Sequence, residues 1–521
     1  MRLELEVPGS VEPTTGPENF ASRLFAHDAS LWGQAAEAEA RVRLGWTDLP
    51  TSSRPLVDII TALRADLQNR GLTHVVLCGM GGSSLAPEVI CSAAGVPLTV
   101  LDSSHPDMVR DALADRLEES VVVVSSKSGG TVETDSLLRA YVDAFEQAGL
   151  RPADHLVIVT DPGSPFDRDA TAAGYLVIKA DPDVGGRYSA LSAFGLVPSG
   201  LAGVDIGALL DGAAAAREEL AVDSPDNPAV RLGTALASAH DAGVDKLVLH
   251  DLTGVGLGDW IEQLVAESTG KAGRGILPVV VPSDHSVNFD PSVADGFMVV
   301  VGGTTPPDAS SGYAAAIEAD LGAQFLLWEA AVAVTGAGLG INPFDQPDVE
   351  SAKQAARKFL DSAGTEITPA DLQTDAISAY GTSSGTLEAA VDDLLGRLDP
   401  ERGYVAVQAY LDRLALPEYA ELRELLAART GRPVTFGWGP RFLHSTGQLH
   451  KGGPATGVYL QLTDDAQQDL DVPGRAFTFG QFIAAQSAGD AQVLQAHRRP
   501  LLRLHLANAA TALPELKRLL A

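Results

Sequence analysis

Three segments of this chain combine glycines with hydroxyl or cationic side chains. GMGGSS at Gly79–Ser84 follows an apolar run, and SSKSGGT at Ser125–Thr131 follows four valines. Glycines let a backbone approach a ligand closely, and successive N–H groups with hydroxyls form an anion site. GGRYS at Gly185–Ser189 adds Arg187, which could stabilise a developing oxyanion or make a structural salt bridge. Two hydroxyl-rich loops in one region favour a small anionic ligand over solvated turns. The spacing of a nucleotide P-loop is absent from both.

Acid–base chemistry is available further along the chain. The segment WIEQLVAESTGK predicts a helix ending near Gly270, with Gln263 and Glu267 four residues apart on one face. A glutamate on that face, beside a bound anion, could serve as a general base, although most helix glutamates are merely solvated. In NPFDQPDVESAK a turn precedes a helix starting near Pro347, and Gln346 and Lys353 could flank a ligand.

Histidines raise the question of a metal. His444 and His450 lie with Lys451 in the Gly-rich segment LHSTGQLHKGG. No nearby carboxylate or cysteine completes a usual zinc set, so no metal site is predicted. The only cysteines are Cys78 and Cys91, which excludes a disulfide framework and a cysteine-rich metal site.

The charge balance limits the partners. With 37 Lys and Arg against 68 Asp and Glu, the 521-residue chain carries a net charge of −31. Nucleic acid and an anionic membrane are therefore not expected as partners, because phosphate backbones need a basic footprint. Because this net charge would repel a phosphate ester, its binding site would have to be built locally from backbone N–H groups, hydroxyls and a few cations. The N-terminus lacks the pattern of a secretory signal, and no run of about 18 apolar residues is seen, so we expect a cytoplasmic protein.

The rhythm of apolar runs predicts the elements that position these segments. Five short β-branched runs alternate with helical patterns, and such strands, buried on both faces, indicate a parallel sheet flanked by helices. The predicted strands are Thr73–Met80, Val96–Asp102, Ser120–Ser126, His155–Pro162 and Tyr175–Asp181. After a helical region at Ile206–Ala242, similar runs recur at Lys246–Asp251, Ile276–Val281 and Phe297–Gly303, and again beyond Tyr404. Gly312–Gly336 predicts one long buried helix.

The predicted fold class is α/β, with two doubly wound domains, each a mainly parallel sheet flanked by helices. We expect an N-terminal arm (1–50), a first domain with the glycine-rich loops (51–205) and the start of a second domain (206–362). A C-terminal α/β part (363–521) would complete the second domain, and residues 363–400 look the most linker-like.

Together these segments resemble the phosphoglucose isomerase family, which is built from two sugar isomerase (SIS) domains. The resemblance is spread over residues 79–353, with a further piece at 443–448. LHSTGQ resembles the family's histidine loop but follows Lys353 instead of preceding it, and 168 residues follow that lysine. His285 is the one candidate at the usual place.

The resemblance implies roles for individual residues. Glu267 would be the catalytic base, Arg187 would face the enediolate, and His444 and Lys353 would assist ring opening. The implied substrate-binding residues are Gly82, Ser83, Ser126, Lys127, Ser128, Thr131, Gly186, Gln263 and Gln346.

The implied activity is interconversion of glucose 6-phosphate and fructose 6-phosphate by proton transfer, with no cofactor and no metal. The resemblance also implies a homodimer that binds a small sugar phosphate. Two alternatives stay open: a dual glucose/mannose 6-phosphate isomerase, and a non-catalytic sugar-phosphate-binding SIS protein. A fused transaldolase–isomerase would need an added barrel of about 250 residues, for which the chain leaves no room.

Overall fold

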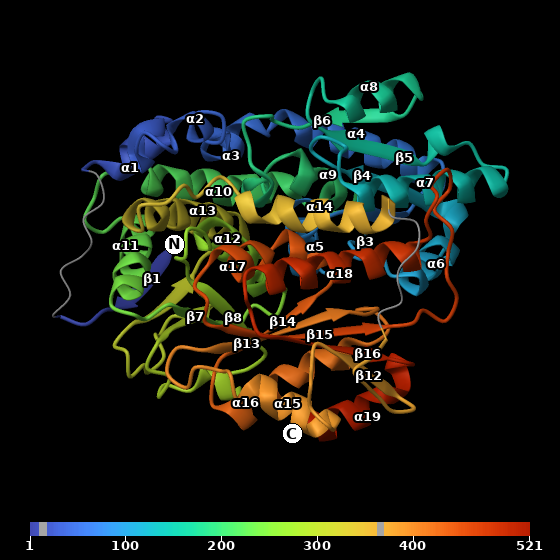
Figure 1. Cartoon of the computed structure of the whole chain (residues 1–521). Coiled ribbons are helices and arrows are strands. Elements are labelled where there is room, and N and C mark those ends of the chain that lie inside the picture. Colours follow the sequence, from blue (N-terminus) through green and yellow to red (C-terminus); the bar gives the residue numbers. More distant parts are fainter. Residues whose placement is uncertain (10–17, 362–368) are drawn as a thin grey trace.

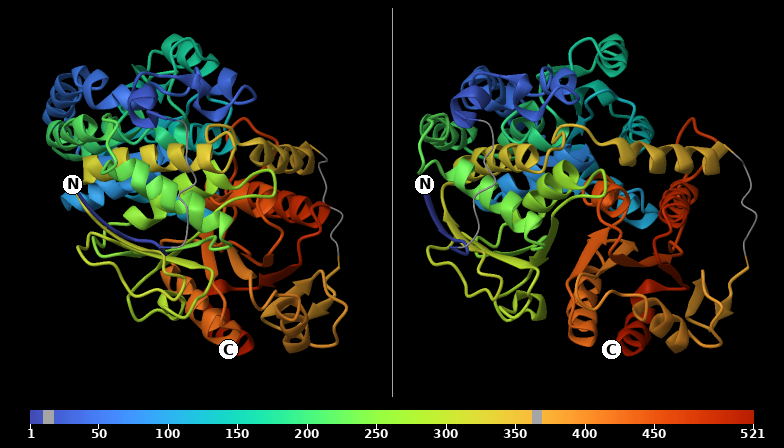
Figure 2. Two further views of the ribbon diagram at one scale, coloured as in Figure 1. Left: turned by 90° about the vertical axis from the view of Figure 1, so that its left-hand side faces the viewer. Right: turned by 60° about the vertical axis from the view of Figure 1, so that its left-hand side comes forward.

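The computed structural model describes residues 1–9, 18–361 and 369–521, and in helix α14 (Pro347–Asp361) not the side chains of residues 349–353, 358 and 361. Three β-sheets are separated and covered by helices (Figure 1). Figure 2 shows the second and third sheets side by side, beneath the layer that holds the first. The predicted α/β class is confirmed.

The first sheet carries the two glycine-rich loops. Its order is β3-β2-β4-β5-β6, and all its strands are parallel. The strands are β2 (His74–Gly79), β3 (Thr99–Leu101), β4 (Ser120–Ser125), β5 (Leu156–Thr160) and β6 (Leu176–Lys179). The helices that connect or cover them are α4 (Pro55–Asn69), α5 (Leu85–Ala94), α6 (Pro106–Ala114), α7 (Val132–Gln147), α8 (Pro165–Ala172) and α9 (Ala193–Ala202).

The second sheet has the order β1-β10-β9-β7-β8, with only β1 antiparallel. The strands are β1 (Arg2–Glu6), β7 (Lys246–Asp251), β8 (Leu277–Val281), β9 (Gly296–Val301) and β10 (Ala314–Glu318). Its helices are α10 (Ile206–Leu220), α11 (Pro228–Asp241), α12 (Leu257–Thr269) and α13 (Leu321–Gly338). Strand β1 thus forms an edge of the sheet by pairing with β10, which is distant from it in sequence. The short helices that follow β1 along the chain are α1 (Phe20–Phe25), α2 (Glu37–Ala40) and α3 (Leu49–Ser52).

The C-terminal residues form a third sheet, and their strands pair among themselves, not with β7–β10. The order is β11-β12-β16-β15-β13-β14, in which the last four are parallel. The strands are β11 (Leu372–Gln373), β12 (Ile377–Tyr380), β13 (Tyr404–Tyr410), β14 (Val434–Trp438), β15 (Gly457–Asp464) and β16 (Leu501–Leu506). The helices are α15 (Leu387–Leu395), α16 (Leu422–Thr430), α17 (Gly447–Gly452), α18 (Phe479–Ala496) and α19 (Ala509–Leu520).

Two expectations from the sequence need correction. Gly312–Gly336 is not one helix, because Ala314–Glu318 forms strand β10 in register with β9, and α13 starts only at Leu321. The expected linker also contains β11, β12 and α15, although residues 362–368 lie outside the described part of the chain.

Helix α13 is the only described helix long and apolar enough to cross a membrane. Its hydropathy is explained by burial, because 83% of the helix lies inside the protein, where it packs along α10 and α11. We therefore interpret α13 as a core helix.

A buried ion cluster joins the first sheet to the third. Arg413, after β13, lies 3.1 Å from both Glu88 on α5 and Asp102 after β3. Arg441 binds the same two carboxylates from the 3-10 turn η9 (Arg441–His444). Burial alone would raise the pKa of Glu88, but the two guanidinium groups lower it to about 2. The cluster fixes η9 against the first sheet.

Glu262 on α12 predicts a pH-dependent stability. Burial, with Asp259 adding to it, raises the pKa of Glu262 from an ordinary 4.5 to about 8. Between these values the folded state binds a proton that the unfolded chain releases, so the free energy of unfolding falls as pH rises through this window. Glu262→Gln should therefore raise the unfolding temperature at pH 8.5 by about 2 °C or more, with little change at pH 4.5. Thermal unfolding at both pH values tests this, and an equal change at both would contradict it.

Candidate active site

Loops attached to all three sheets meet at the glycine-rich segment after β2. A side-chain carbon on Gly82 would lie 1.9 Å from the Gly186 carbonyl oxygen, so only glycine fits there. Gly81 has a φ of 56°, and a carbon on it would lie 2.8 Å from the His444 carbonyl oxygen and 3.0 Å from Gln263 Nε2. Ser83 lies in the same 3-10 turn, η3 (Gly81–Ser83). The close backbone approach brings the predicted sugar loop against the arginine, histidine and glutamine segments.

Glu267 lies near the end of α12, with its side chain 12% exposed. Its Oε1 is 3.1 Å from Arg187 Nη1, and its Oε2 accepts a hydrogen bond of 3.2 Å from Gln263 Nε2. Gln263 is held in turn, because the same Nε2 donates to the His444 carbonyl oxygen at 2.7 Å. The i,i+4 spacing that the sequence suggested thus fixes the carboxylate beside a cation.

Arg187 is buried, with 3% of its side chain exposed, and each guanidinium nitrogen has an acceptor. Nε donates to Ser268 Oγ at 2.8 Å, Nη1 to Gln346 Oε1 at 3.0 Å, and Nη2 to the carbonyl oxygens of Pro343 and Asp345 at 2.6 and 3.0 Å. The turn before α14 therefore holds the guanidinium from one side and Glu267 contacts it from the other. Arg187, Gln346 and Glu267 are brought together.

Lys271 is a second buried cation at this turn, and the sequence did not single it out. Its Nζ donates to the carbonyl oxygens of Asn342 and Asp345 and lies 2.8 Å from the Asp345 carboxylate. Burial, with the Arg187 charge adding to it, lowers the pKa of Lys271 to about 8. The lysine stabilises the backbone turn that presents Gln346 and the acceptors of Arg187.

His444 is positioned by a carboxylate that the sequence did not predict. Its Nε2 lies 3.0 Å from Glu133 Oε1, and Gln486 Nε2 on α18 donates to the same oxygen at 2.8 Å. Glu133 is the second residue of α7, directly after the Ser/Gly loop, where a carboxylate also suits the helix N-terminus. Such a partner orients the imidazole ring.

The loop after β4 is shaped by its own hydroxyls. Ser126 Oγ accepts from Gly129 N at 3.1 Å, and Ser128 Oγ accepts from Gly130 N at 3.2 Å. Lys127, in contrast, donates to the carbonyl oxygens of Pro182 and Val184 at 2.9 and 2.7 Å and pairs with Asp161 at 3.0 Å. Its ammonium group thus anchors a neighbouring segment and is not turned toward the pocket.

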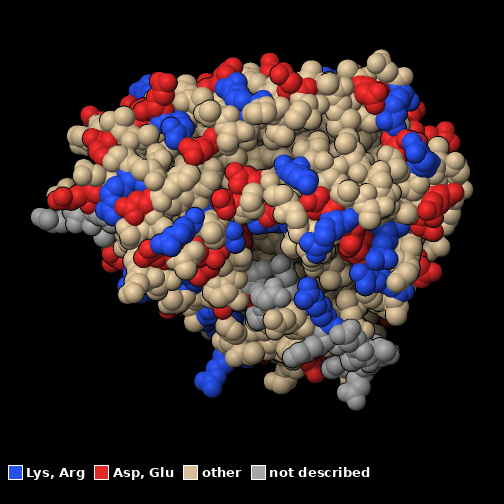
Figure 3. All heavy atoms as spheres, turned by 90° about the horizontal axis from the view of Figure 1, so that it is seen from above, with Lys and Arg blue, Asp and Glu red and all other residues tan. Residues whose placement is uncertain are grey.

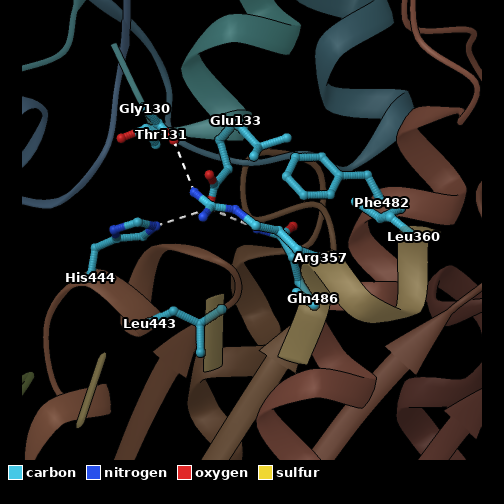
Figure 4. Close-up of a pocket in the computed structure, with 11 residues that line it drawn as sticks. Gly130, Thr131, Glu133, Arg357, Leu360, Leu443, His444, Phe482 and Gln486 are labelled. Carbon is cyan, nitrogen blue, oxygen red and sulfur yellow. Dashed lines mark hydrogen bonds and ion pairs between the residues drawn. The ribbon is translucent and has the colours of Figure 1, made fainter. Parts of the chain in front are cut away.

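A pocket lies between this loop and the histidine loop (Figure 4). It is lined by Gly130, Thr131, Val132, Glu133, Ala356, Arg357, Leu360, Leu443, His444, Phe482 and Gln486. Arg357, from α14, points into it and donates to the Gly130 carbonyl oxygen at 3.3 Å. Among the described residues, the Lys or Arg side chain at the pocket is therefore Arg357, one helical turn after Lys353, and that spacing is the only sequence signal for it. Lys353 lies on the same helix, but its side chain is outside the described residues.

The other two candidate histidines, His450 and His285, do not line this pocket. His450 is buried, with its Nδ1 3.0 Å from the Tyr404 hydroxyl, and burial beside Lys451 and Arg499 lowers its pKa to about 3. The His285 side chain is 92% exposed, next to Asp284. Within the described ranges, no group of three or more His, Cys, Asp or Glu side chains is arranged to hold a metal ion.

Charges of both signs are mixed on one face of the molecule. On the face seen in Figure 3, Lys and Arg side chains are interspersed with Asp and Glu. That face therefore presents no continuous basic patch.

Comparisons with known proteins identify the family of the chain and the likeness of its fold. A model of the family described as phosphoglucose isomerase matches residues 60–274. A glucose-6-phosphate isomerase from Rippkaea orientalis is 31% identical over 57% of this chain and 67% of its own length. One from Citrifermentans bemidjiense is 30% identical over 56% of this chain and 66% of its own. The matched part spans 41% of the relative from Thermosynechococcus vestitus. A solved glucose-6-phosphate isomerase from Chlamydia trachomatis has a TM-score of 0.51 at 21% identity, covering 67% of this chain and 79% of its own.

A parallel first sheet with glycine-rich loops at the carboxyl ends of its strands, together with two further mainly parallel sheets, gives an α/β fold of the SIS type. The likeness to the Chlamydia structure confirms the fold. Within that class, the chain belongs to the phosphoglucose isomerase family.

Proposed function

We propose that this chain is an aldose–ketose isomerase that interconverts D-glucose 6-phosphate and D-fructose 6-phosphate through a cis-enediol intermediate. The observation that carries the proposal is the pair formed by Glu267 and Arg187, whose charged atoms lie 3.1 Å apart in a mostly buried place. A base and a fixed cation side by side suit a proton transfer that creates an oxyanion. The family of the chain supports the same reaction.

In the proposed reaction, His444 and Lys353 assist opening of the sugar ring. Glu267 then takes the proton from carbon 2 of the aldose and returns it to carbon 1. Arg187 stabilises the negative oxygen of the enediolate, and it needs little reorganisation because five acceptors already hold it. Carbon 2 is oxidised and carbon 1 reduced within the same molecule, so no external redox cofactor is required.

Phosphate recognition is proposed for the loop after β4. Ser126, Lys127, Ser128 and Thr131 were implied by the resemblance. We assign the contacts to the backbone N–H groups and the Ser and Thr hydroxyls, and give Lys127 the bracing role that its bonds to residues 182 and 184 support. Gly82, Ser83 and Gly186 would line the sugar, with Gln263 and Gln346 holding the catalytic charges. Binding the phosphate away from the reacting carbons would position the sugar.

The alternatives differ in what they need from this site. A sugar-phosphate-binding protein without activity needs the loops but not the Glu267–Arg187 pair, so that pair favours an enzyme. A dual isomerase would use the same groups and also accept mannose 6-phosphate.

Turnover of the three hexose phosphates tests the proposal. Fructose 6-phosphate would be coupled to glucose-6-phosphate dehydrogenase without added metal, and mannose 6-phosphate formation would be measured in parallel. We expect turnover to glucose 6-phosphate in the presence of a chelator. Binding of fructose 6-phosphate without turnover would overturn the proposal, and mannose 6-phosphate formed at a similar rate would favour the dual isomerase.

A histidine series should identify the residue that opens the ring. His444→Asn is expected to lower kcat with fructose 6-phosphate by about 10²-fold, a typical contribution of a positioned proton donor. His285→Asn, on the surface, should leave kcat within about twofold, and His450→Asn should affect stability more than kcat, because His450 is buried against Tyr404. Steady-state kinetics and thermal unfolding of the three variants check this. A larger loss of kcat for either control would refute the assignment to His444.

We further propose a cytoplasmic homodimer. Two buried free cysteines, Cys78 and Cys91, suit a reducing compartment. The homodimer follows from the resemblance alone, and size-exclusion chromatography with light scattering tests it. We keep the proposed division into 1–50, 51–205, 206–362 and 363–521; the last part, which was expected to complete the second domain, forms a sheet of its own.

A further inference from the structure

The three sheets share one strand order. Four parallel strands run β3-β2-β4-β5 in the first, β8-β7-β9-β10 in the second and β14-β13-β15-β16 in the third. In each, the chain reverses its direction of winding after the second strand formed. Open sheets of this kind bind ligands beyond the carboxyl ends of their strands, near that reversal. In the third sheet the corresponding place is next to β13 and β15, and the proposed isomerase site does not use it.

A groove of about 1510 Å³ lies at this place. Its walls come from the carboxyl ends of β13, β15 and β16, from one side of α18, and from residues 105–106 of the first unit. The groove and the pocket of Figure 4 both meet Leu360 on α14, but they meet α18 at different residues, with Phe482 and Gln486 lining only the pocket. Helix α18 is thus a wall shared by two cavities.

One face of the third sheet is apolar, and the other carries a row of polar side chains beside a smaller apolar cluster. Valines, leucines and alanines of β13, β15 and β16 face α15, α16 and α19 in a continuous core. On the opposite face, Gln408, Gln461 and Arg503 are register partners on three neighbouring strands. Buried polar side chains are normally hydrogen-bonded, so this row of side chains on the sheet is expected to have polar partners.

Arg503 lacks a carboxylate partner among the described side chains. Its Nε donates to Gln461 Oε1 at 2.8 Å, and its guanidinium carbon lies 5.7 Å from the centre of the Tyr380 ring. Arg503 is half-buried where it lines the groove, and this burial lowers its pKa. In a chain with 68 acidic and 37 basic residues, a half-buried arginine without a paired acid is a candidate to bind an anion.

The nearby carboxylates are engaged with other groups. Asp464 lies 3.1 Å from His105, Asp465 lies 3.4 Å from His505, and Asp371 accepts from the Gly381 backbone N–H. They therefore do not neutralise Arg503 in this arrangement.

Tyr410 supplies a second unsatisfied group. Its ring is 2% exposed, and its hydroxyl has no hydrogen-bond partner within the described part of the chain. Tyr410 lines the groove at the carboxyl end of β13, on the same face of the sheet as Arg503. A buried hydroxyl normally has a partner, so this one marks a place for a ligand oxygen.

We propose that the groove is a second ligand site, which binds a small organic oxyanion, a phosphate ester or a carboxylate, through the Arg503 guanidinium and the Tyr410 hydroxyl. The site is separate from the proposed isomerase site and does not depend on its activity.

Calorimetric titration of the full chain with inorganic phosphate and, separately, with malonate tests the proposal. For at least one probe, wild type should bind one more equivalent per chain than Arg503→Gln. Phosphate alone would identify a phosphate ester as the ligand class, and malonate alone a dicarboxylate. Equal stoichiometry in wild type and Arg503→Gln for both probes would overturn the proposal.

Two further variants keep the test decisive if Arg503→Gln does not fold. Arg503→Lys retains the charge but not the planar fork, and should weaken the extra site by about tenfold while keeping its stoichiometry. Tyr410→Phe removes only the hydroxyl and should weaken the same site several-fold. Unchanged affinity in both variants would refute the proposed contacts.

Discussion

Glu267→Gln should lower kcat for fructose 6-phosphate by about 10²–10⁴-fold, with a small change in KM. Gln has nearly the same shape and can keep a hydrogen bond, but it cannot accept the carbon-bound proton. The loss should thus fall on the chemical step and not on binding. Coupled kinetics give kcat and KM, and exchange of the carbon 2 hydrogen with deuterated water reports proton transfer directly.

Glu262→Gln is a matched control for this change. Glu262 lies on the same helix, five residues earlier, and within the described part of the chain its side chain makes no hydrogen bond or ion pair with Arg187 or Gln263. It should keep kcat within a few-fold at neutral pH. If Glu267→Gln retained full deuterium exchange, another group would have to be the base.

Arg187→Lys should lower kcat by about 10²–10³-fold, as removal of a preorganised oxyanion donor does. A lysine cannot satisfy the oxygens of Ser268, Gln346, Pro343 and Asp345 at once, because it lacks the planar arrangement of donors. The charge would remain, but its position would be less fixed. Steady-state kinetics and the affinity of a stable enediolate mimic, such as a hydroxamate of the sugar acid phosphate, measure the effect.

Arg432→Lys separates loss of a catalytic cation from loss of a buried ion pair. Arg432 is buried and pairs with Asp295, at the second and third sheets, away from the pocket. It should lower the unfolding temperature but leave kcat nearly unchanged. Should both variants reduce kcat equally, the effect of Arg187 would be one of folding.

The fold was predictable where burial alone decides the residue types. The β-branched runs of β2, β4 and β5 are buried on both faces. Such continuous apolar runs are typical of the central strands of a parallel sheet, so these strands could be predicted from the sequence. Strand β10 was missed because Ala314–Ala316 suit a helix equally well, and only pairing with β9 selects the extended form. Strand β1 likewise takes its extended form by pairing with β10, which is distant from it in sequence.

The site was predictable where a residue lies in a recognisable segment. Glu267 and Gln263 share a helix face by spacing alone, and Arg187 and Gln346 belong to segments that resemble the family. Glu133 could not be found in this way, because its contacts with His444 and Gln486 join residues more than 300 positions apart. For Lys127 the charge was predictable but its direction was not, because the carbonyl groups of Pro182 and Val184 decide it.

The side chains proposed for catalysis are drawn from the whole length of one chain. Arg187 and Glu267 come from the first two thirds, whereas His444 belongs to the last third, held by the ion cluster of Arg413 and Arg441. A nascent chain would therefore carry its base and its oxyanion cation long before its ring-opening histidine exists. With these proposed roles, the ability to process a closed sugar would appear only when the third sheet docks against the first.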